Sequence, residues 1–309
     1  MANQELVVPE GVSGERVDKV VAGLLGVSRS VARELVDLGA RVDGAPVSAS
    51  DRVSAGSVIT VATPEPEEDL AAESVGFDVL YEDEHLIVVD KPAGVVVHPG
   101  SGRSRGTLVA GLLHRYPELE GVGEAGRWGL VHRLDRDTSG ALVVARTADA
   151  HGALSEMMRR REISRVYLAL VHGLPGSPTG TIDAPIGRDP ANPLRRAVHP
   201  DGKHARTHYR VLDRFPDRDC SLLEVRLETG RTHQIRVHLS AIGHPVVADT
   251  LYGARRHRHG ARRIFLHAAR LSLTHPVTGE RLEVESPLPE DLATVLGGLG
   301  PGSGPNPIP

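Results

Sequence analysis

The spacing of apolar residues near the amino terminus predicts two short helices and a small sheet. Valine and leucine recur every three or four positions over 17–25, the period of an amphipathic helix. Ser28 is a suitable N-cap for a second helix, and Gly39 favours its end. An Asp-Gly pair at 43–44 predicts a hairpin turn between two short strands, and a closing strand is expected after it. Together these elements form an expected module over 14–61.

Longer apolar runs predict the strands of a larger body. They lie at 86–90, 141–146, 167–173 and 221–230. Helices are expected at 147–164 and 230–243, so regular helices do not separate all the strands. This order favours an α+β fold with a mixed, largely antiparallel central β-sheet and flanking helices over a doubly wound sheet. The N-terminal module is then a smaller α/β part of the chain.

Composition marks the expected boundaries of this body. Residues 62–74 are rich in proline and glutamate and have no apolar period, as in an acidic linker. The body is expected over 75–292, and the Gly/Pro-rich segment 293–309 is expected to be a disordered tail. A chain of 309 residues suits two domains of these sizes.

Composition also excludes several classes of protein. Hydrophobic residues make up 40% and charged residues 25% of the chain, values typical of a soluble globular protein. No apolar run approaches the roughly 18–20 residues that span a bilayer. The first residues resemble no secretory signal, so a cytoplasmic protein without membrane partners is expected. Cys220 is the only cysteine, which excludes an internal disulfide and a multi-cysteine metal site.

Charge is distributed unevenly along the chain. The formal net charge is −4, yet residues 91–309 hold 30 basic and 22 acidic side chains, a formal charge of +8. Residues 65–90 hold ten acidic side chains and no Lys or Arg. A basic body suits a polyanionic partner, although a solvated surface of mixed charge explains the same numbers equally well.

The stretch GLVHRLDRDTSG, residues 129–140, concentrates ionisable side chains between two apolar segments. In an extended chain, Arg133, Asp135 and Asp137 project to one face. Nearby arginines favour the ionised form of a carboxylate, which can then act as a nucleophile or a general base. An Arg–Asp pair that only stabilises a turn is the alternative, and it is the more common case for an isolated Arg-x-Asp. The turn itself is expected at 138–140, where the chain returns to the sheet.

A second polar stretch, LETGRTHQIRVHL at 227–239, follows an apolar strand. Its guanidinium and amide groups, among them Arg231 and Gln234, suit anionic or base-edge contacts. A solvated helix start is the alternative. His233 and His238 are not expected to share a metal, because a spacing of five puts them on opposite faces of a strand and about 140° apart on a helix.

Three further features have structural explanations on their own. Tyr167 lies in an apolar strand, as core tyrosines do. The basic run at 254–263 suits an exposed loop, with phosphate contact as the alternative. Residues 135–138, Asp-Arg-Asp-Thr, are similar to the D-x-D-x-T motif of Mg²⁺-dependent phosphoaspartyl transferases, with the threonine one position early. Against that reading, His132 and Arg133 interrupt the apolar strand that should precede the first aspartate, and no Asp-Asp pair follows to complete a Mg²⁺ site.

Six stretches in order resemble the RluA-type pseudouridine synthases. HRLDRDTSG is similar to the signature of that family, and DKPAGVVVHPG stands before it. The others follow it: RVYLALVHG, TGRTHQIRVHL, GHPVVADTLYG and RIFLHA. The resemblance covers roughly residues 75–290. The module at 14–61 resembles the S4 RNA-binding fold, which accompanies the family members that modify ribosomal RNA of the large subunit.

The resemblance implies that a uridine in RNA is detached at its N-glycosidic bond and rejoined through C5, with no cofactor and no metal. Asp135 is then expected to be the catalytic residue, attacking the ribose or the base, and Arg133 to extrude and hold the nucleotide. Tyr167 is expected to stack on the flipped base, and Arg231 to pair with Asp135 or a nearby phosphate. Ile235 is expected to form an apolar wall of the pocket.

The expected partner is RNA, namely 23S ribosomal RNA or a precursor of the large subunit rather than tRNA, and a monomer is expected. RNA contacts are predicted from five basic side chains: Arg16, Arg29, Arg33, Arg41 and Lys91. The module itself is formally neutral, with six basic and six acidic side chains. A non-enzymatic RNA-binding protein or assembly factor is the rival interpretation. Asp90 and Ala248 depart mildly from the family pattern, which often has Asn and Gly there.

Overall fold

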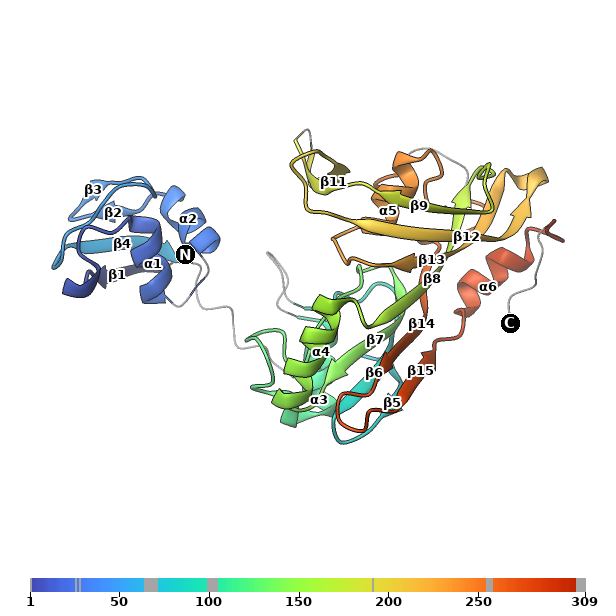
Figure 1. Cartoon of the computed structure of the whole chain (residues 1–309), viewed down its shortest axis with the longest axis horizontal. Coiled ribbons are helices and arrows are strands. Elements are labelled where there is room, and N and C mark those ends of the chain that lie inside the picture. Colours follow the sequence, from blue (N-terminus) through green and yellow to red (C-terminus); the bar gives the residue numbers. More distant parts are fainter. Residues whose placement is uncertain are drawn as a thin grey trace. The chain divides into compact units, whose positions relative to one another are not determined.

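Figure 1 shows the computed structural model of the chain. The structure describes residues 2–25, 27, 29–63, 72–98, 105–190, 192–253 and 258–303. The chain divides into two units, Met1–Leu70 and Ala71–Pro309, which are considered separately here.

Two helices and a four-stranded sheet form the N-terminal unit. The helices are α1 (Val17–Leu25) and α2 (Arg29–Asp37), with a 3₁₀ turn at Glu10–Val12. The sheet has the order β1-β4-β2-β3, with β1 (Ala2–Val7), β2 (Arg41–Val42), β3 (Ala45–Pro46) and β4 (Val58–Thr63). Val17, Val20 and Val21 are buried in its core, as the helical spacing predicts. The predicted Ser28 cap lies outside the described residues.

Strand β1 makes this unit larger than predicted. It pairs with β4 in an antiparallel register from Ala2↔Thr63 to Val7↔Val58, so the unit begins at residue 2 rather than at 14. Among residues 4–7 only Leu6 is buried, and this mostly polar edge strand carries no clear strand pattern. The expected linker, 62–74, overlaps the end of β4, and its residues 64–71 lie outside the described part of the chain.

A sheet of nine strands, counted over the described residues, forms the centre of the second unit. Eight strands follow the order β5-β6-β7-β14-β8-β13-β12-β9, and β15 pairs with β14. Their bounds are β5 (Asp78–Glu82), β6 (Leu86–Lys91), β7 (Ser139–Ala145), β8 (Ser164–His172), β9 (Thr179–Asp183), β12 (Arg206–Phe215), β13 (Cys220–Leu227), β14 (Leu266–Thr274) and β15 (Arg281–Glu285). Only β7 and β14 pair in parallel. The predicted mixed, largely antiparallel sheet is confirmed.

Helix α4 (Ala148–Arg160) packs against the middle of this sheet (Figure 1). Ala150 and Leu154 are buried in a core cluster with side chains of β6 and β7. Thr147 begins the helix by accepting a hydrogen bond from the Ala150 amide at 3.2 Å, and Arg161 ends it in a left-handed conformation. With 13 residues, α4 is the longest described helix, and no described helix could span a membrane.

The remaining elements include a helix in the supposed tail. They are α3 (Leu108–Arg115), α5 (Gln234–Ala241), α6 (Glu290–Gly297), 3₁₀ turns at Pro117–Leu119 and Pro216–Arg218, and a separate hairpin of β10 (Ile186–Asp189) and β11 (Asn192–Val198). Val295 and Leu299 are buried against Phe215, so the expectation of a disordered tail from residue 293 is wrong. Leucine and valine at helical spacing order this segment despite its glycines. Residues 304–309 lie outside the described part.

Candidate active site

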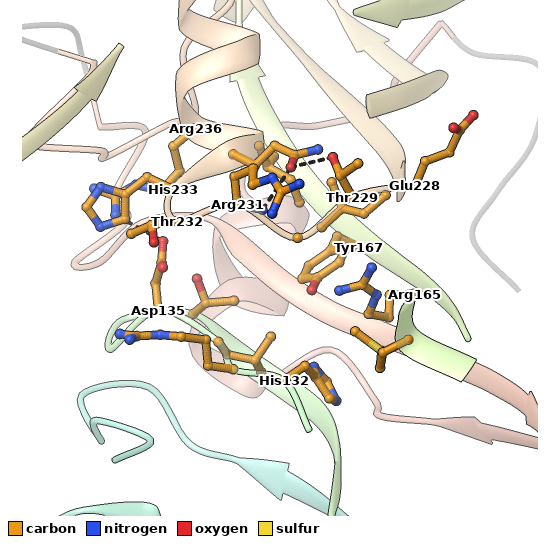
Figure 2. Close-up of a pocket in the computed structure, with 18 of the residues that line it drawn as sticks. His132, Asp135, Arg165, Tyr167, Glu228, Thr229, Arg231, Thr232, His233 and Arg236 are labelled. Atoms are coloured by element: carbon orange, nitrogen blue, oxygen red, sulfur yellow. Dashed lines mark hydrogen bonds and ion pairs between the residues drawn. The ribbon is translucent and has the colours of Figure 1, made fainter. Parts of the chain in front are cut away.

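A pocket of about 410 Å³ lies in the second unit (Figure 2). Residues 131–135 and Thr138, from the loop that precedes β7, line one side. The end of α4, the start of β8 and the segment 227–236, which connects β13 to α5, line the rest. The fold therefore brings together the two polar stretches that the sequence singles out.

Glycines fix both ends of the loop 129–140 against the sheet. Gly129 has a φ of 73°, and a Cβ added to it would lie 2.4 Å from the Ala145 carbonyl oxygen. Gly140 has a φ of 117°, and a Cβ there would lie 2.3 Å from the Ala268 carbonyl oxygen. Any other residue would collide with backbone at either position, so the path of the loop depends on both glycines.

His132, to which the sequence assigns no role, supports the loop from the inside. Its Nε2 accepts a hydrogen bond from the Val143 amide of β7 at 3.1 Å. Burial, and then the nearby Arg165, lower the pKa of His132 to about 3, so the imidazole is neutral. Leu134 is buried beside it. His132 and Leu134 therefore anchor the loop, and they also line the pocket together with Asp135.

Lys91 holds the loop in place, and its buried, fully bonded side chain does not support the RNA contact, which stays a prediction. Its side chain is fully buried. The Nζ donates to the carbonyl oxygens of Pro92, Val95 and Arg136 at 2.7, 2.9 and 3.0 Å. An ammonium whose three N–H bonds are all used inside the protein has none left for phosphate. Lys91 instead ties the turn after β6 to the loop that carries Asp135.

The turn of this loop lies earlier than predicted. The Thr138 amide donates to the Asp135 carbonyl at 3.2 Å, which places the turn at 135–138, and Ser139 already belongs to β7. Asp137 braces the turn by pairing with Arg136, with N–O distances of 2.9 and 3.0 Å. The expectation that the turn lies at 138–140 is therefore wrong, because Ser139 already pairs with His267 of β14.

Asp135 pairs with Arg236 of α5 and not with Arg231. Arg236 Nη1 lies 3.1 Å from Asp135 Oδ2, and its Nε and Nη2 donate to both oxygens of Asp249 at 2.7 and 3.0 Å. Asp249 is itself fully buried and also accepts from the backbone amides of Leu251 and Tyr252. Asp249 thus fixes Nε and Nη2 of Arg236, and Nη1 of the same guanidinium is directed at Asp135.

Ala248, the residue before Asp249, has a φ of 59°. This left-handed conformation explains why the family often has glycine at that position. The presence of alanine instead of glycine at 248 therefore concerns the backbone conformation, and the Asp249 carboxylate keeps its contacts with Arg236.

The start of α5 explains which arginine faces inward. Arg231 lies before the helix, is exposed, and donates from Nε to the His204 carbonyl at 3.1 Å. Arg236 lies in the first turn of α5, where the helical register directs it toward Asp135. The two residues belong to one sequence motif, and the sequence alone does not tell which of them pairs with the aspartate.

Gln234 is a structural residue, which corrects its predicted contact with the base. Its Oε1 accepts from the Thr229 hydroxyl and the Arg231 amide at 2.8 and 2.9 Å. Its Nε2 donates to the Arg206 carbonyl and the Thr207 hydroxyl at 3.0 and 2.9 Å. All four hydrogen-bonding positions of the amide are occupied, so none is available to a base. Gln234 fixes the approach to α5.

Tyr252 packs against the outer side of Arg236. The guanidinium carbon of Arg236 lies 5.0 Å from the centre of the Tyr252 ring. The Tyr252 hydroxyl accepts from the Arg196 amide at 2.8 Å and lies 2.9 Å from His233 Nδ1. The Tyr252 hydroxyl and His233 Nδ1 therefore share one hydrogen bond, and burial lowers the pKa of His233, which favours its neutral imidazole.

The other predicted substrate residues all line the pocket, and their contacts with a nucleotide stay predictions. Tyr167 of β8 and Ile235 of α5 are buried side chains that line the pocket. Burial raises the pKa of Tyr167, so its hydroxyl stays protonated. Arg133 is exposed at the pocket and lies 3.2 Å from His98, measured from Nη1 to Nε2. Tyr167, Ile235, Arg133 and Asp135 thus line one pocket.

The arginines of the N-terminal unit are engaged with their own unit. Arg16 donates to Asp18 at 2.9 and 3.1 Å, and Arg29 donates to the same carboxylate at 3.2 Å. Arg33 lies 3.9 Å from a carboxylate of the same helix, and Arg41 donates to a backbone carbonyl. Their guanidinium groups are largely exposed, so an RNA contact by these arginines stays a prediction.

The described residues include no group of three or more His, Cys, Asp or Glu side chains arranged to hold a metal ion. His238 Nδ1 and Nε2 lie 2.8 and 2.9 Å from the Thr207 hydroxyl and the Ala184 carbonyl. His238 is therefore a buried structural residue on the far side of α5 from Arg236. The reactive groups of the pocket are the carboxylate of Asp135, the hydroxyl of Tyr167 and the surrounding guanidinium groups.

Comparison with known proteins identifies the family that shares this site. The family model described as RNA pseudouridylate synthase matches residues 85–241, which include both polar stretches of the pocket. The chain belongs to the RNA pseudouridylate synthase family. Asp135 and Arg236 therefore lie within the part of the chain that defines the family.

Curated relatives and solved structures agree with this membership. The chain is 52% identical over 294 residues to an RNA pseudouridine synthase of Chloroflexus aurantiacus, covering 94% of this chain and 92% of that one. It is 45% identical over 303 residues to the ribosomal large subunit pseudouridine synthase D of Nitrosomonas europaea, covering 94% and 86%. Human RNA pseudouridylate synthase domain containing 4 has a similar fold, with a TM-score of 0.58 and 27% identity over 74% of this chain and 95% of that one. The chain is an isomerase that converts uridine in RNA to pseudouridine.

Proposed function

We propose that this chain modifies uridines in ribosomal RNA of the large subunit, with Asp135 as the reacting carboxylate. The names of several relatives that match nearly the full chain support the substrate, since they are large-subunit pseudouridine synthases. The observation that carries the catalytic assignment is the position of Asp135, which is paired with a fixed arginine inside the pocket.

The geometry leaves one oxygen of Asp135 for chemistry. Arg236 occupies Oδ2, and no described residue donates a hydrogen bond to Oδ1. Arg236 holds the carboxylate in one orientation, and an aspartate carboxylate can act as a nucleophile or a general base. The free oxygen can then react with the ribose or the base of a bound uridine. No cofactor is called for, because bond cleavage and bond formation involve the same two halves of the nucleotide.

A base stacked in a helix cannot reach this oxygen, so the target uridine is flipped out. Only 21% of the Asp135 side chain is exposed, and the pocket around it has the size of a small ligand site. Tyr167 and Ile235 supply apolar walls for the base. Arg133 and Arg231 are exposed at the pocket and suit the phosphates of the extruded nucleotide.

The N-terminal unit is proposed to bind RNA as an S4-like module. Of the four arginines predicted to contact RNA, Arg33 and Arg41 are less committed to internal ion pairs than Arg16 and Arg29, and they are the preferred phosphate ligands. The enzyme is proposed to act as a monomer in the cytoplasm, where ribosomal RNA and its precursors are available to it.

Mapping of pseudouridines tests the proposed substrate. Ribosomal RNA and tRNA are compared between cells that contain this chain and cells that lack it. We expect one or a few pseudouridines to disappear from the large-subunit RNA alone and to return when the wild-type chain is restored. Loss confined to tRNA would contradict the ribosomal assignment and leave the chemistry intact.

A further inference from the structure

Arg165 is a second cationic side chain of the pocket, and neither the sequence motifs nor the pairing of Asp135 gives it a role. It lies at the start of β8, two residues before Tyr167 and on the same face of the strand. Only 7% of it is exposed. Figure 2 shows Arg165 and Tyr167 side by side in the pocket.

The guanidinium of Arg165 has no partner among the described residues. No hydrogen bond or ion pair joins it to any of them, and its Nε is buried without an acceptor. Arg236, in the same pocket, has two carboxylate partners, so the contrast between the two arginines is large. A buried cation without an anion or hydrogen-bond acceptor is unfavourable, and such a group is usually retained for a ligand.

Two neighbours of Arg165, His132 and Gly230, leave its guanidinium unpaired. The imidazole of His132 is neutral, since its pKa is lowered to about 3 by burial and by Arg165 itself. Gly230 lies against the guanidinium, and a Cβ at that position would be 2.9 Å from Arg165 Nη1. The glycine thus gives the guanidinium the room that it occupies in the pocket.

The depth of Arg165 indicates which part of a nucleotide it meets. Apart from Arg236, which is bound to two carboxylates, the other arginines that line the pocket are exposed at its edge: Arg133, Arg159, Arg161 and Arg231. Phosphate groups of an RNA strand remain with the strand and suit that edge. Arg165 is buried beside the ring on which the base is proposed to stack, so the group that reaches it belongs to the base.

We infer that Arg165 donates hydrogen bonds to a carbonyl oxygen of the uracil ring as the ring becomes negatively charged. The inference rests on the proposed action of Asp135 on a flipped uridine. When the N1–C1′ bond breaks, its electron pair passes to the uracil ring and spreads to the ring oxygens, while C1′ becomes electron-deficient. C5 then bonds to C1′, C5 loses its proton, and N1 gains one, so no electrons or atoms are lost. A buried guanidinium stabilises the charged ring more than the neutral base.

Kinetics of Arg165 variants test this inference. Arg165→Met keeps the length of the side chain and removes its charge, and Arg165→Lys keeps the charge without the planar donors. For Arg165→Met we expect kcat to fall by about 100-fold with KM nearly unchanged, and for Arg165→Lys a smaller loss. Thermal unfolding should show Arg165→Met at least as stable as the wild type, because this variant removes a buried charge that has no internal partner. A kcat within a few-fold of wild type would overturn the inference, whereas an inactive wild type would instead contradict the proposed function.

Two further measurements test whether Arg165 acts directly in catalysis and whether it contacts the base or a phosphate. Added methylguanidinium should restore part of the activity of Arg165→Ala, and no rescue by any concentration would count against direct contact. An RNA with an uncharged methylphosphonate next to the target uridine should slow the wild type and Arg165→Met by the same factor. If the modified RNA slowed only the wild type, Arg165 would bind the phosphate and the assignment to uracil would be wrong.

Gly230→Ala provides a matched change outside Arg165 itself. The added methyl displaces the end of a flexible side chain and not backbone, so its cost in stability is small. We expect it to lower kcat in the same direction as Arg165→Met and to have little further effect when combined with it. Full additivity of the two substitutions would show that Gly230 acts independently of Arg165.

Discussion

Arg236 illustrates how the site depends on the geometry of one side chain. Burial alone would lower the pKa of its guanidinium, but the bonds to Asp249 and then to Asp135 raise it. Asp249 accepts from Nε and Nη2 of Arg236 with its two oxygens, and Nη1 of Arg236 is directed at Asp135. This arrangement needs the planar fork of arginine, and a lysine cannot reproduce it.

Replacement of Arg236 by lysine is therefore expected to impair catalysis although the charge is kept. We predict that Arg236→Lys lowers kcat by about 100-fold, because Asp135 loses its fixed partner. Steady-state kinetics on a large-subunit RNA transcript measure the effect. Arg226→Lys is the matched control, since Arg226 is exposed on β13 and does not line the pocket, and its kcat should stay close to wild type. Equal losses in the two variants would contradict the assignment of Arg236.

At the scale of elements, the catalytic loop is held between the turn that follows β6 and the first residues of β7. Gly94 donates from its amide to the Arg136 carbonyl at 2.9 Å, and Lys91 donates to the same oxygen. Burial lowers the pKa of Lys91 to about 7, while three carbonyl acceptors match the three N–H bonds of its protonated form. The loop thus depends on a residue whose side chain is fully buried.

Lys91→Met should separate this structural role from RNA binding. The variant removes three buried hydrogen bonds, although the Arg136 carbonyl keeps the Gly94 amide as a donor, and we predict a loss of about 3 kcal/mol in the free energy of unfolding. Urea denaturation measures that loss, and filter binding measures RNA affinity under native conditions. Affinity is expected to stay near the wild-type value. A variant with unchanged stability and much weaker RNA binding would show that Lys91 contacts phosphate after all.

The sequence predicts elements with a strong local pattern and misses those that depend on tertiary pairing. The apolar runs of β6 and β7 and the periodicity of α1 are visible because each is buried along most of its length. Strand β1 is not, because its polar sequence is an edge that pairs with β4. Helix α6 is obscured by the glycines and prolines that follow it.

The candidate site shows the same division. Asp135 and Tyr167 could be predicted from their motifs, and both line the pocket. The partner of Asp135 could not, because Arg231 and Arg236 are equivalent in a sequence and only the start of α5 distinguishes them. The role of Lys91 also depends on contacts with residues 45 positions away.

At the scale of the whole molecule, the N-terminal unit has no excess of positive charge, since its module at 14–61 holds six basic and six acidic side chains. Asp18 is buried and binds Arg16 and Arg29, and these bonds lower the pKa of its carboxyl to about 2. A carboxyl whose pKa is depressed in the folded state stabilises that state above its unfolded pKa near 4 and loses the effect as pH falls through about 2.

Acid titration of the full chain tests this contribution. At pH 6 we expect Asp18→Asn to lower the free energy of opening of the N-terminal unit by about 2 kcal/mol. The difference between the variant and the wild type should shrink as pH falls from 4 to 2. Hydrogen exchange of the amides of α1 and α2, read by mass spectrometry, reports on this unit within the intact protein. A difference that is independent of pH would mean that Asp18 acts through packing and not through its charge.

The reaction of Asp135 is tested most directly by single-turnover formation of pseudouridine in a large-subunit RNA transcript. Asp135→Asn is compared with Asp137→Asn, the same change two residues away on a carboxylate that only braces the turn. We predict that Asp135→Asn lowers the rate by at least about 10³-fold while RNA affinity is retained, and that Asp137→Asn stays active. An Asp135→Asn variant that forms pseudouridine at the wild-type rate would contradict the mechanism.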